Sequence, residues 1–291
     1  MKVITCPRGN NIETCSFSPR PGAVRDAPEV GLLSCDSCQV VVHDKDLSQL
    51  VNYEESSMWD YLGNSTDTME SPKSDLVRRA EALKTLKVST EKLRLIDVGC
   101  SDGTMLGELA SDFYVFGVEP EKRRLQETRS KGFTCWQTAT EAISNGELFD
   151  VVTMFHVIEH VYDAHTFLRE IKQLIKPNGL LVVETPNAND VLLTRYFSSA
   201  FANFTFWSHH PILYSHAALE SLVKNAGFQI IENQGIQRYS LDNHLFWLAN
   251  SKPGGHEIWK ELYSQETLEA YGRDLIENKV NDTLWLVAKN V

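Results

Sequence analysis

The chain has 291 residues and a formal net charge of −11 at pH 7, with 28 lysines and arginines against 39 aspartates and glutamates. This balance argues against nucleic acid as the main partner, because neutralising phosphates requires clustered cationic side chains. No apolar run approaches the roughly 18 residues of a membrane span, and the first ten residues, MKVITCPRGN, lack the apolar core of a signal peptide. We therefore predict a cytoplasmic protein.

Residues 1–70 form a cysteine-bearing unit rich in proline, glycine and polar residues, with a short helix expected within 46–70. Clustered cysteines in a reducing compartment indicate a metal before a disulfide. The stretch SCDSCQVVVHD contains two cysteines in a C-x2-C spacing, which is half of a tetrahedral zinc site. A structural zinc ion is predicted, and the alternative is a ribbon-like unit that has lost its metal. The candidate ligands are Cys6, Cys15, Cys35 and Cys38.

Residues 71–291 are predicted to form the main domain. Its pattern is helical from Ser74, and strand and helix patterns then alternate. Short apolar runs predict strands at 93–98, 115–118, 151–155 and 180–184. Helical spacing predicts helices at 105–110, 121–131 and 164–176, the last of which is ended by the turn KPNG. The alternation predicts an α/β fold with a doubly wound parallel sheet.

The C-terminal part departs from this pattern. A helix is predicted at 217–226 and a strand at 228–231, and DTLWLVAKN reads as a closing strand. Between these strands lies an aromatic-rich insertion, residues 236–281. A loop of this length is typical of a functional segment, so it is expected either to recognise the substrate or to form a homodimer.

The stretch LRLIDVGCSDGTML allows two interpretations. GCSDG fits the nucleophile elbow of a hydrolase, with Ser101 as the nucleophile, but the preceding residues lack an HGGG-like oxyanion motif. The loop also fits a glycine turn around a cofactor. Asp97 and Asp102 flank it and no basic residue does, which suits a cationic group such as the methionine end of S-adenosylmethionine better than a phosphate. Glu119 follows the next strand, where an acid binds ribose hydroxyls.

Four segments in this order, IDVGCSDG, FGVEP, FDVVTMFHVIEHV and LIKPNGLLVVETPN, resemble the motifs of class I S-adenosylmethionine-dependent methyltransferases. The resemblance covers residues 90–235 and the closing strand at 283–288. It implies a seven-stranded Rossmann-like sheet whose last strand is antiparallel, and S-adenosyl-L-methionine as the cofactor. The cofactor-binding residues that it implies are Asp97, Gly99, Cys100, Asp102, Gly103, Glu119, Pro120, Phe155 and His156.

The aromatic segment WSHHPILYS resembles sugar-modifying methyltransferases that carry an N-terminal zinc ribbon, although a tryptophan replaces their tyrosine. By this resemblance His210 is the first candidate for a general base and His209 the second, since the pKa of histidine is near neutrality. A histidine that only binds a loop is the alternative. A metal held by His156, Glu159 and His160 of HVIEHV is a weaker hypothesis. The substrate-binding candidates are Trp207, Tyr214, Arg238, His244 and Lys252.

These observations predict methyl transfer to a small polar acceptor, foremost a nucleotide-linked or glycan sugar. A small-molecule O-methyltransferase, a serine hydrolase and a non-catalytic cofactor-binding scaffold are the alternatives.

Overall fold

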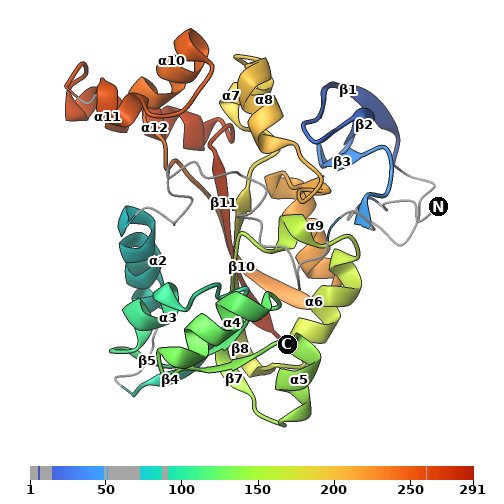
Figure 1. The fold of residues 1–291 in the computed structure, drawn as a ribbon, viewed down its shortest axis with the longest axis vertical. Helices are drawn as coiled ribbons and strands as arrows, with labels where there is room; N and C mark the ends of the chain where they lie inside the picture. Colours follow the sequence, from blue (N-terminus) through green and yellow to red (C-terminus); the bar gives the residue numbers. More distant parts are fainter. Residues whose placement is uncertain (1–5, 7–14, 49–50, 52–72, 87–90, 260) are drawn as a thin grey trace.

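A computed structural model describes residues 6, 15–48, 51, 73–86, 91–259 and 261–291 (Figure 1). A mixed sheet of seven strands forms the centre of the molecule. Its spatial order is β10 (Phe228–Ile236), β11 (Thr283–Asn290), β8 (Ile175–Pro186), β7 (Phe149–Phe155), β4 (Leu93–Val98), β5 (Phe113–Val118) and β6 (Thr134–Trp136). The strands from β8 to β6 are parallel, and β11 is antiparallel to both of its neighbours. The predicted seven-stranded fold with an antiparallel last strand is confirmed.

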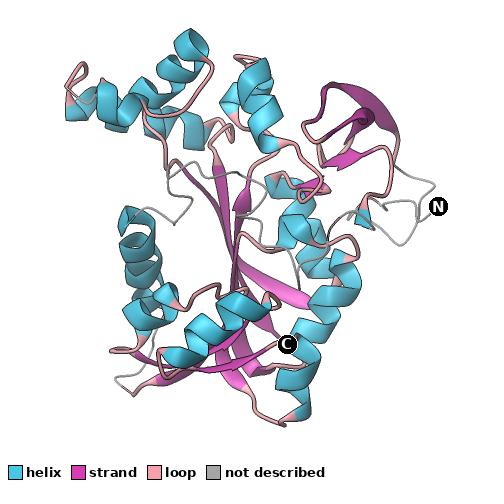
Figure 2. Ribbon diagram, viewed as in Figure 1, coloured by secondary structure: helices cyan, strands magenta, loops and turns pink. Residues whose placement is uncertain are grey.

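Helices cover both faces of this sheet (Figure 2). Successive residues of a strand point to opposite faces, so Leu95 packs into one apolar cluster and Ile96 into another, as do Val151 and Val152. The first cluster contains residues of α2 (Lys73–Thr85) and α3 (Thr104–Leu109). The second contains residues of α5 (Ala139–Ser144), α6 (Ala164–Lys172) and α9 (His216–Asn225). Burial on both faces explains why these strands are short continuous apolar runs.

The N-terminal unit forms a second, antiparallel sheet in the order β1 (Phe17–Val24), β2 (Ala27–Cys35), β3 (Val41–His43) and β9 (Ile212–Leu213). Its fourth strand therefore comes from the main part of the chain, with Val42 opposite Ile212. The unit also shares an apolar cluster with the central sheet. Residues 49–50 and 52–72 lie outside the described residues. They include most of the segment 46–70, for which a short helix is predicted.

Two insertions lie beyond the central sheet, at the same end of the molecule as the N-terminal sheet (Figure 1). The first contains α7 (Val191–Thr194) and α8 (Ser199–Thr205). The aromatic-rich insertion folds into α10 (Leu241–Asn250), α11 (Gly255–Ile258) and α12 (Gln265–Glu277). In the described part of the chain, none of the helices has the length and apolar character that a transmembrane helix needs.

Two details differ from the sequence prediction. The helix predicted to reach residue 176 ends at Lys172, and KPNG lies inside β8. Asn178 has a φ of 65°, and the pairing with β7 shifts register between Phe149 and Val151. A bulge in the strand therefore absorbs the turn residues. The strand β6 was not predicted, because three residues are too few for a periodic pattern to show.

Candidate functional site

The loop after β4 is a tight glycine turn. Gly99, Ser101 and Gly103 have φ values of 80°, 50° and 77°, in the left-handed region where glycine is favoured. The backbone N–H groups of Gly99 and Cys100 donate to the carbonyl of Val118, at 2.7 and 3.1 Å, which ties the loop to the end of β5. Among the described residues, the Ser101 hydroxyl forms no hydrogen bond with a histidine, so the hydrolase alternative finds no support there.

Asp97 is buried at the carboxyl end of β4. Its Oδ1 accepts a hydrogen bond of 2.7 Å from Thr153 Oγ1 on the neighbouring strand β7. Burial raises the pKa of this carboxyl to about 6, although the hydrogen bond from Thr153 and the charge of Arg79 lower it. A buried carboxylate with one oxygen engaged in this way is suited to a cationic ligand at the loop.

Glu119 follows β5 and reaches back over the glycine loop. Its Oε2 accepts from the backbone N–H of Ser101 and its Oε1 from that of Glu121, both at 2.8 Å. Burial raises the pKa of Glu119 to about 7, against the two backbone hydrogen bonds that lower it. Pro120, next to it, is half-buried. The carboxylate is thus fixed in position, with lone pairs left for ribose hydroxyls.

Two other loop residues are occupied by structural contacts. Asp102 accepts from the backbone and the hydroxyl of Thr104 at the start of α3, and it pairs with Lys131 at 2.9 Å. Cys100 packs against Gly117 and lies 3.5 Å from the sulfur of Cys135. The Cys100 side chain therefore fills a small apolar cluster under the loop.

His156 follows β7 with a φ of 56° and belongs to a buried network of charges. Its Nδ1 lies 3.1 Å from Glu159 Oε1, and its Nε2 lies 3.0 Å from Arg238 Nη1. Glu184 of β8 pairs with Arg79 of α2 at 2.6 Å and lies 3.4 Å from His156 Nε2. The network joins the cofactor side of the sheet to the aromatic insertion, through Arg238.

Phe155 and Arg238, predicted to bind cofactor and substrate, are buried or nearly so. The ring of Phe155 stacks on Trp285 and lies under the guanidinium of Arg79 at 4.8 Å. Arg238 Nη1 lies 3.3 Å from Asp75, and its Nε lies 3.8 Å from Asp282.

The two histidines proposed as the base differ in their surroundings. His209 is buried and stacks on Trp207 with ring centroids 4.4 Å apart, and its Nδ1 lies 3.2 Å from Ser208 Oγ. His210 is half-buried, and its Nδ1 donates to the carbonyl of Thr205 at 2.9 Å. Burial lowers the pKa of His209 to about 4 and that of His210 to about 3. Burial thus makes both imidazoles weaker bases than a free histidine, and the assignment of either one as the general base stays a prediction.

In the structure His210 lies beside Glu159 and His160, a neighbourhood that the sequence did not predict. One possible ligand atom from each of Glu159, His160 and His210 lies within 4.8 Å of the others. The metal set considered from HVIEHV had His156 in place of His210. Only the fold brings residue 210 beside residues 159 and 160, so no local spacing could have indicated it.

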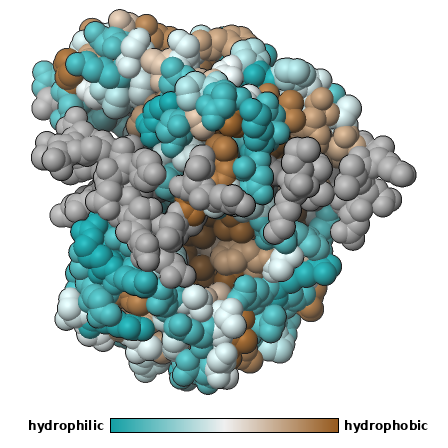
Figure 3. Space-filling model, turned by 45° about the vertical axis from the view of Figure 1, so that its right-hand side comes forward, coloured by the Kyte–Doolittle hydropathy of each residue, from teal (hydrophilic) through white to brown (hydrophobic). Residues whose placement is uncertain are grey.

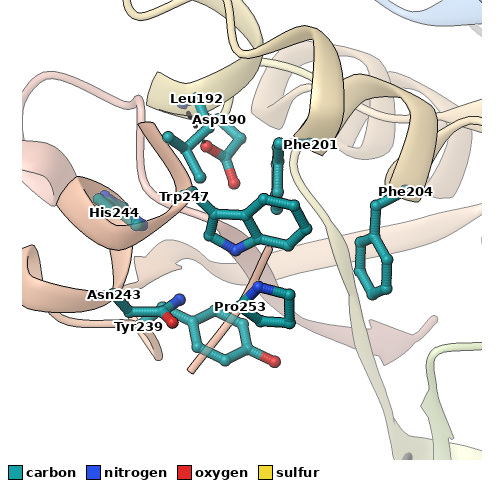
Figure 4. A pocket seen from close by; sticks show the side chains of 9 residues that line it. All are labelled: Asp190, Leu192, Phe201, Phe204, Tyr239, Asn243, His244, Trp247 and Pro253. Atoms are coloured by element: carbon teal, nitrogen blue, oxygen red, sulfur yellow. Dashed lines mark hydrogen bonds between the residues drawn. The ribbon is translucent and has the colours of Figure 1, made fainter. Parts of the chain in front are cut away.

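Among the other substrate candidates, His244 lies at a separate cavity. His244 lines a cavity of about 60 Å³ between α7, α8 and α10, and its Nδ1 lies 2.8 Å from the Tyr271 hydroxyl. In Figure 4, Phe201 and Phe204 from α8 approach Trp247 from α10. The complete lining is Asp190, Leu192, Phe201, Phe204, Tyr239, Asn243, His244, Trp247 and Pro253. Lys252 is exposed.

Three of the four predicted zinc ligands lie together. Cys6 Sγ is 3.3 Å from Cys38 Sγ and 3.7 Å from Cys35 Sγ, and all three side chains are buried. A tetrahedron of zinc–sulfur bonds of about 2.3 Å has its sulfurs about 3.8 Å apart, so the spacing fits. Cys15 is half-buried against the same apolar cluster and is not a member of this group of three.

One face of the molecule has a hollow whose floor is hydrophobic, between the upper and lower parts of the view in Figure 3. Such a concave apolar surface is typical of a small-molecule site.

The methyltransferase domain family matches residues 68–233, which is more than half of the chain. Ubiquinone biosynthesis O-methyltransferase of Rickettsia typhi is 34% identical over 103 residues, which cover 33% of this chain and 42% of that protein. The protein of the same name from Cereibacter sphaeroides is 36% identical over 107 residues, covering 34% of this chain and 43% of that protein. The chain thus spans less than half the length of these relatives.

A solved structure, a SAM dependent methyltransferase from Archaeoglobus fulgidus, superposes with a TM-score of 0.53 at 17% identity, covering 75% of this chain and 94% of that one. At this identity the superposition concerns the fold alone. Since the family match extends over most of the central sheet, and the sheet has the strand order described above, the chain belongs to the methyltransferase domain family.

Proposed function

We propose that the protein is an S-adenosylmethionine-dependent methyltransferase that acts on a hydroxyl group of a small polar molecule. The observation that carries this proposal is the pair of buried carboxylates, Asp97 and Glu119, on adjacent strands around a glycine turn. Asp97 beside the loop disfavours a phosphate there and suits a cationic methionine end, and Glu119 is placed to accept the hydroxyls of a ribose.

When bound, S-adenosyl-L-methionine supplies a methyl group on a positively charged sulfur. Glu119 would accept the ribose hydroxyls, since its oxygens are already oriented by two backbone N–H groups. Asp97 would lie beside the cationic end, together with the backbone of Gly99 and Gly103. The side chains of Cys100 and Asp102 have other contacts, so they would contribute through the backbone of the loop.

The acceptor would lie beyond the carboxyl ends of β4 and β7, where His156 contacts Arg238. Trp207 and Tyr214 stay candidates for substrate contact from the segment around β9. The enzyme has to hold the acceptor oxygen in line with the methyl carbon, and this orientation supplies a large part of the rate. Hydroxyl methylation is favoured over other acceptors by the O-methyltransferase names of the relatives.

A sugar hydroxyl remains a candidate acceptor because of the cysteine-bearing N-terminal unit, and an aromatic hydroxyl is the other. Calorimetry with S-adenosylmethionine tests the cofactor, with Glu119→Ala expected to weaken binding by about tenfold or more. Release of the demethylated cofactor with a panel of nucleotide-linked sugars and of phenols then tests the acceptor. Cofactor binding without turnover on any of these would favour a non-catalytic scaffold.

A structural zinc ion bound to Cys6, Cys35 and Cys38 is part of the same proposal. Their sulfur spacing and burial support it. The described part of the chain assigns no fourth ligand. Formation of a homodimer through the aromatic insertion also stays a prediction.

A further inference from the structure

A second group of possible metal ligands lies in the central part of the molecule, separate from the three cysteines. It consists of Glu159 and His160 from the short 3-10 helix η3 (Ile158–His160) and of His210 from the segment before β9. One ligand atom from each of the three lies within 4.8 Å of the others, and the two imidazole centroids are 4.8 Å apart. Two imidazoles and one carboxylate are a common ligand set for divalent transition metals with open coordination positions.

Backbone carbonyls fix the tautomer of both imidazoles. His160 Nδ1 is 2.6 Å from the carbonyl of His209, and His210 Nδ1 is 2.9 Å from the carbonyl of Thr205. A carbonyl only accepts, so in each neutral ring the proton resides on Nδ1 and the lone pair is on Nε2. Metal-binding histidines almost always have the second ring nitrogen held in this way.

The carboxylate is also held by outer partners. Glu159 Oε2 accepts a hydrogen bond of 2.9 Å from Thr185 Oγ1, and Oε1 lies 3.1 Å from His156 Nδ1. Each carboxylate oxygen keeps a further lone pair, so an ion can be bound without breaking these contacts.

A buried hydroxyl without a partner directly follows β9 (Ile212–Leu213), the strand that contacts η3. Tyr214 is 1% exposed, and among the described residues its hydroxyl has no hydrogen-bond partner. A buried hydroxyl of this kind is explained if an oxygen ligand accepts its hydrogen bond in the working enzyme.

The group is also adjacent to the cofactor loop. Val157, two residues before Glu159, packs directly on Gly99 of that loop. His160 and His210 are half-buried, which leaves room for a ligand to approach from solvent.

We propose that Glu159, His160 and His210 bind a divalent first-row transition metal ion, whose open position takes the hydroxyl oxygen of the methyl acceptor. The second half of this inference rests on the proposed function. In the reaction the O–H bond of the acceptor breaks and its proton passes to solvent. The oxygen then bonds to the methyl carbon while the carbon–sulfur bond breaks, and the electron pair stays on sulfur. The metal lowers the pKa of the bound hydroxyl, as metals do for bound water, which removes the need for a strong histidine base.

Manganese(II) is the probe for the site, because it prefers oxygen and nitrogen ligands and so does not report on the three thiolates. Metal-stripped protein is titrated with Mn(II), and the loss of the free-ion electron paramagnetic resonance signal is measured. The intact protein is expected to bind one ion per chain. His210→Asn and His160→Asn keep a donor in the Nδ1 position for the backbone carbonyl but remove Nε2, so they should weaken binding more than the roughly 10–100-fold expected for loss of an outer partner. Thr185→Val removes such a partner and should fall within that range.

His256→Asn is the matched control, since His256 is exposed and lies outside the group, and its binding should equal that of the intact protein. Glu159→Gln, which removes the charge of the carboxylate ligand, is a further variant of the site. Thermal denaturation identifies any variant that fails to fold. If Glu159→Gln does not fold, His210→Asn tests the site in its place, because residue 210 is half-buried. Absence of Mn(II) binding in the intact protein, or equal binding by His210→Asn, would overturn the site. Full methyl transfer by the metal-stripped enzyme would overturn its role toward the acceptor and leave the proposed function intact. The titration needs neither cofactor nor acceptor, so failure of the proposed function would show separately.

Discussion

Gly99 and Val157 are in direct contact, although 58 residues separate them in the chain. A β-carbon added at Gly99 would lie 2.5 Å from Val157 Cγ2, closer than side-chain carbons approach in proteins. This contact holds the loop after β4 against the segment after β7. The first segment is expected to bind the methyl donor, and the second contains Glu159 and His160 of the proposed metal site. The close approach of the two segments therefore requires a residue without a side chain.

We expect Gly99→Ala to weaken S-adenosylmethionine binding by about tenfold or more and to lower the free energy of unfolding by about 1–3 kcal/mol. Both the positive φ and the contact with Val157 oppose the added methyl group. Calorimetry and chemical denaturation measure the two effects. Gly132→Ala is the matched control, since Gly132 has a φ of 88° and nothing within 4 Å of its added β-carbon. Val157→Ala in the Gly99→Ala background should recover part of the loss, and no recovery would mean that strain alone is responsible.

Glu119 gives a pH dependence of stability whose sign follows from its pKa. The folded protein holds this proton up to a pKa of about 7, whereas the ordinary pKa of a glutamate side chain is 4.5, so the folded state binds more protons between these values. The contribution of Glu119 to stability is therefore fully present below 4.5 and is lost as the pH rises to about 7. In Glu119→Gln the side chain does not titrate. The stability of the variant relative to the intact protein should rise across this window by about 1.4 kcal/mol per pH unit at most.

Denaturant unfolding of both proteins across the window checks this expectation. The amide of glutamine disturbs the hydrogen bonds of Ser101 and Glu121, but that effect is the same at each pH and shifts the whole curve. The titration of Asp97 is present in both proteins and cancels in the difference. Parallel stability curves for the two proteins would contradict the raised pKa of Glu119.

The sequence predicted those features of the fold that depend on local pattern. The mainly apolar stretch Leu93–Val98 coincides with β4, because a parallel strand buried on both faces is rich in apolar residues. The glycine turn and the acid after β5 were also recognised, since positive φ and the ribose site each restrict the residue type at one position.

The features that escaped prediction depend on contacts between distant segments. His210 lies beside Glu159 because β9 joins the N-terminal sheet, and this pairing of Ile212 with Val42 has no trace in either local pattern. The insertion from residue 236 onward reads as irregular because its helices bury only part of their surface and carry mixed faces. Likewise, Arg238 appeared as a candidate for substrate contact, but its burial among Asp75, His156 and Asp282 is a property of the folded chain alone.

The N-terminal cysteines predict a metal content that can be measured directly. The purified protein is expected to contain one zinc ion per chain and to lose it in Cys38→Ser, because a serine hydroxyl is a poor replacement for a thiolate. Removal of the ion with a chelator should lower the melting temperature, since it leaves three buried thiols around an empty position. Cys135→Ser is the control, as Cys135 is buried and lies in another cluster. Elemental analysis showing equal zinc in the two variants would contradict the site.

Arg238 should be more important for stability than any exposed arginine. Its side chain is only 17% exposed and lies between Asp75 and Asp282, and its backbone N–H donates to Asp282 Oδ2 at 2.8 Å. Removing one partner of a buried charge group leaves the others uncompensated, so Arg238→Gln is expected to lower the free energy of unfolding by about 3–5 kcal/mol. Arg273→Gln is the matched control, because the side chain of Arg273 is 62% exposed and pairs with Glu269 at a distance of 4.0 Å. Such surface pairs contribute about 0–1 kcal/mol to the free energy of unfolding.

Denaturant unfolding of both variants, at equal m-values, measures this difference. A substrate role for Arg238 requires more than a loss of stability. At a temperature where Arg238→Lys remains folded, its Michaelis constant for the acceptor should rise, because lysine keeps the charge but loses the planar group that contacts His156. An unchanged Michaelis constant in a destabilised but folded variant would assign Arg238 to the structure of the network alone. The contact between Arg238 and His156 would then act on the reaction only by fixing the segment that carries Glu159.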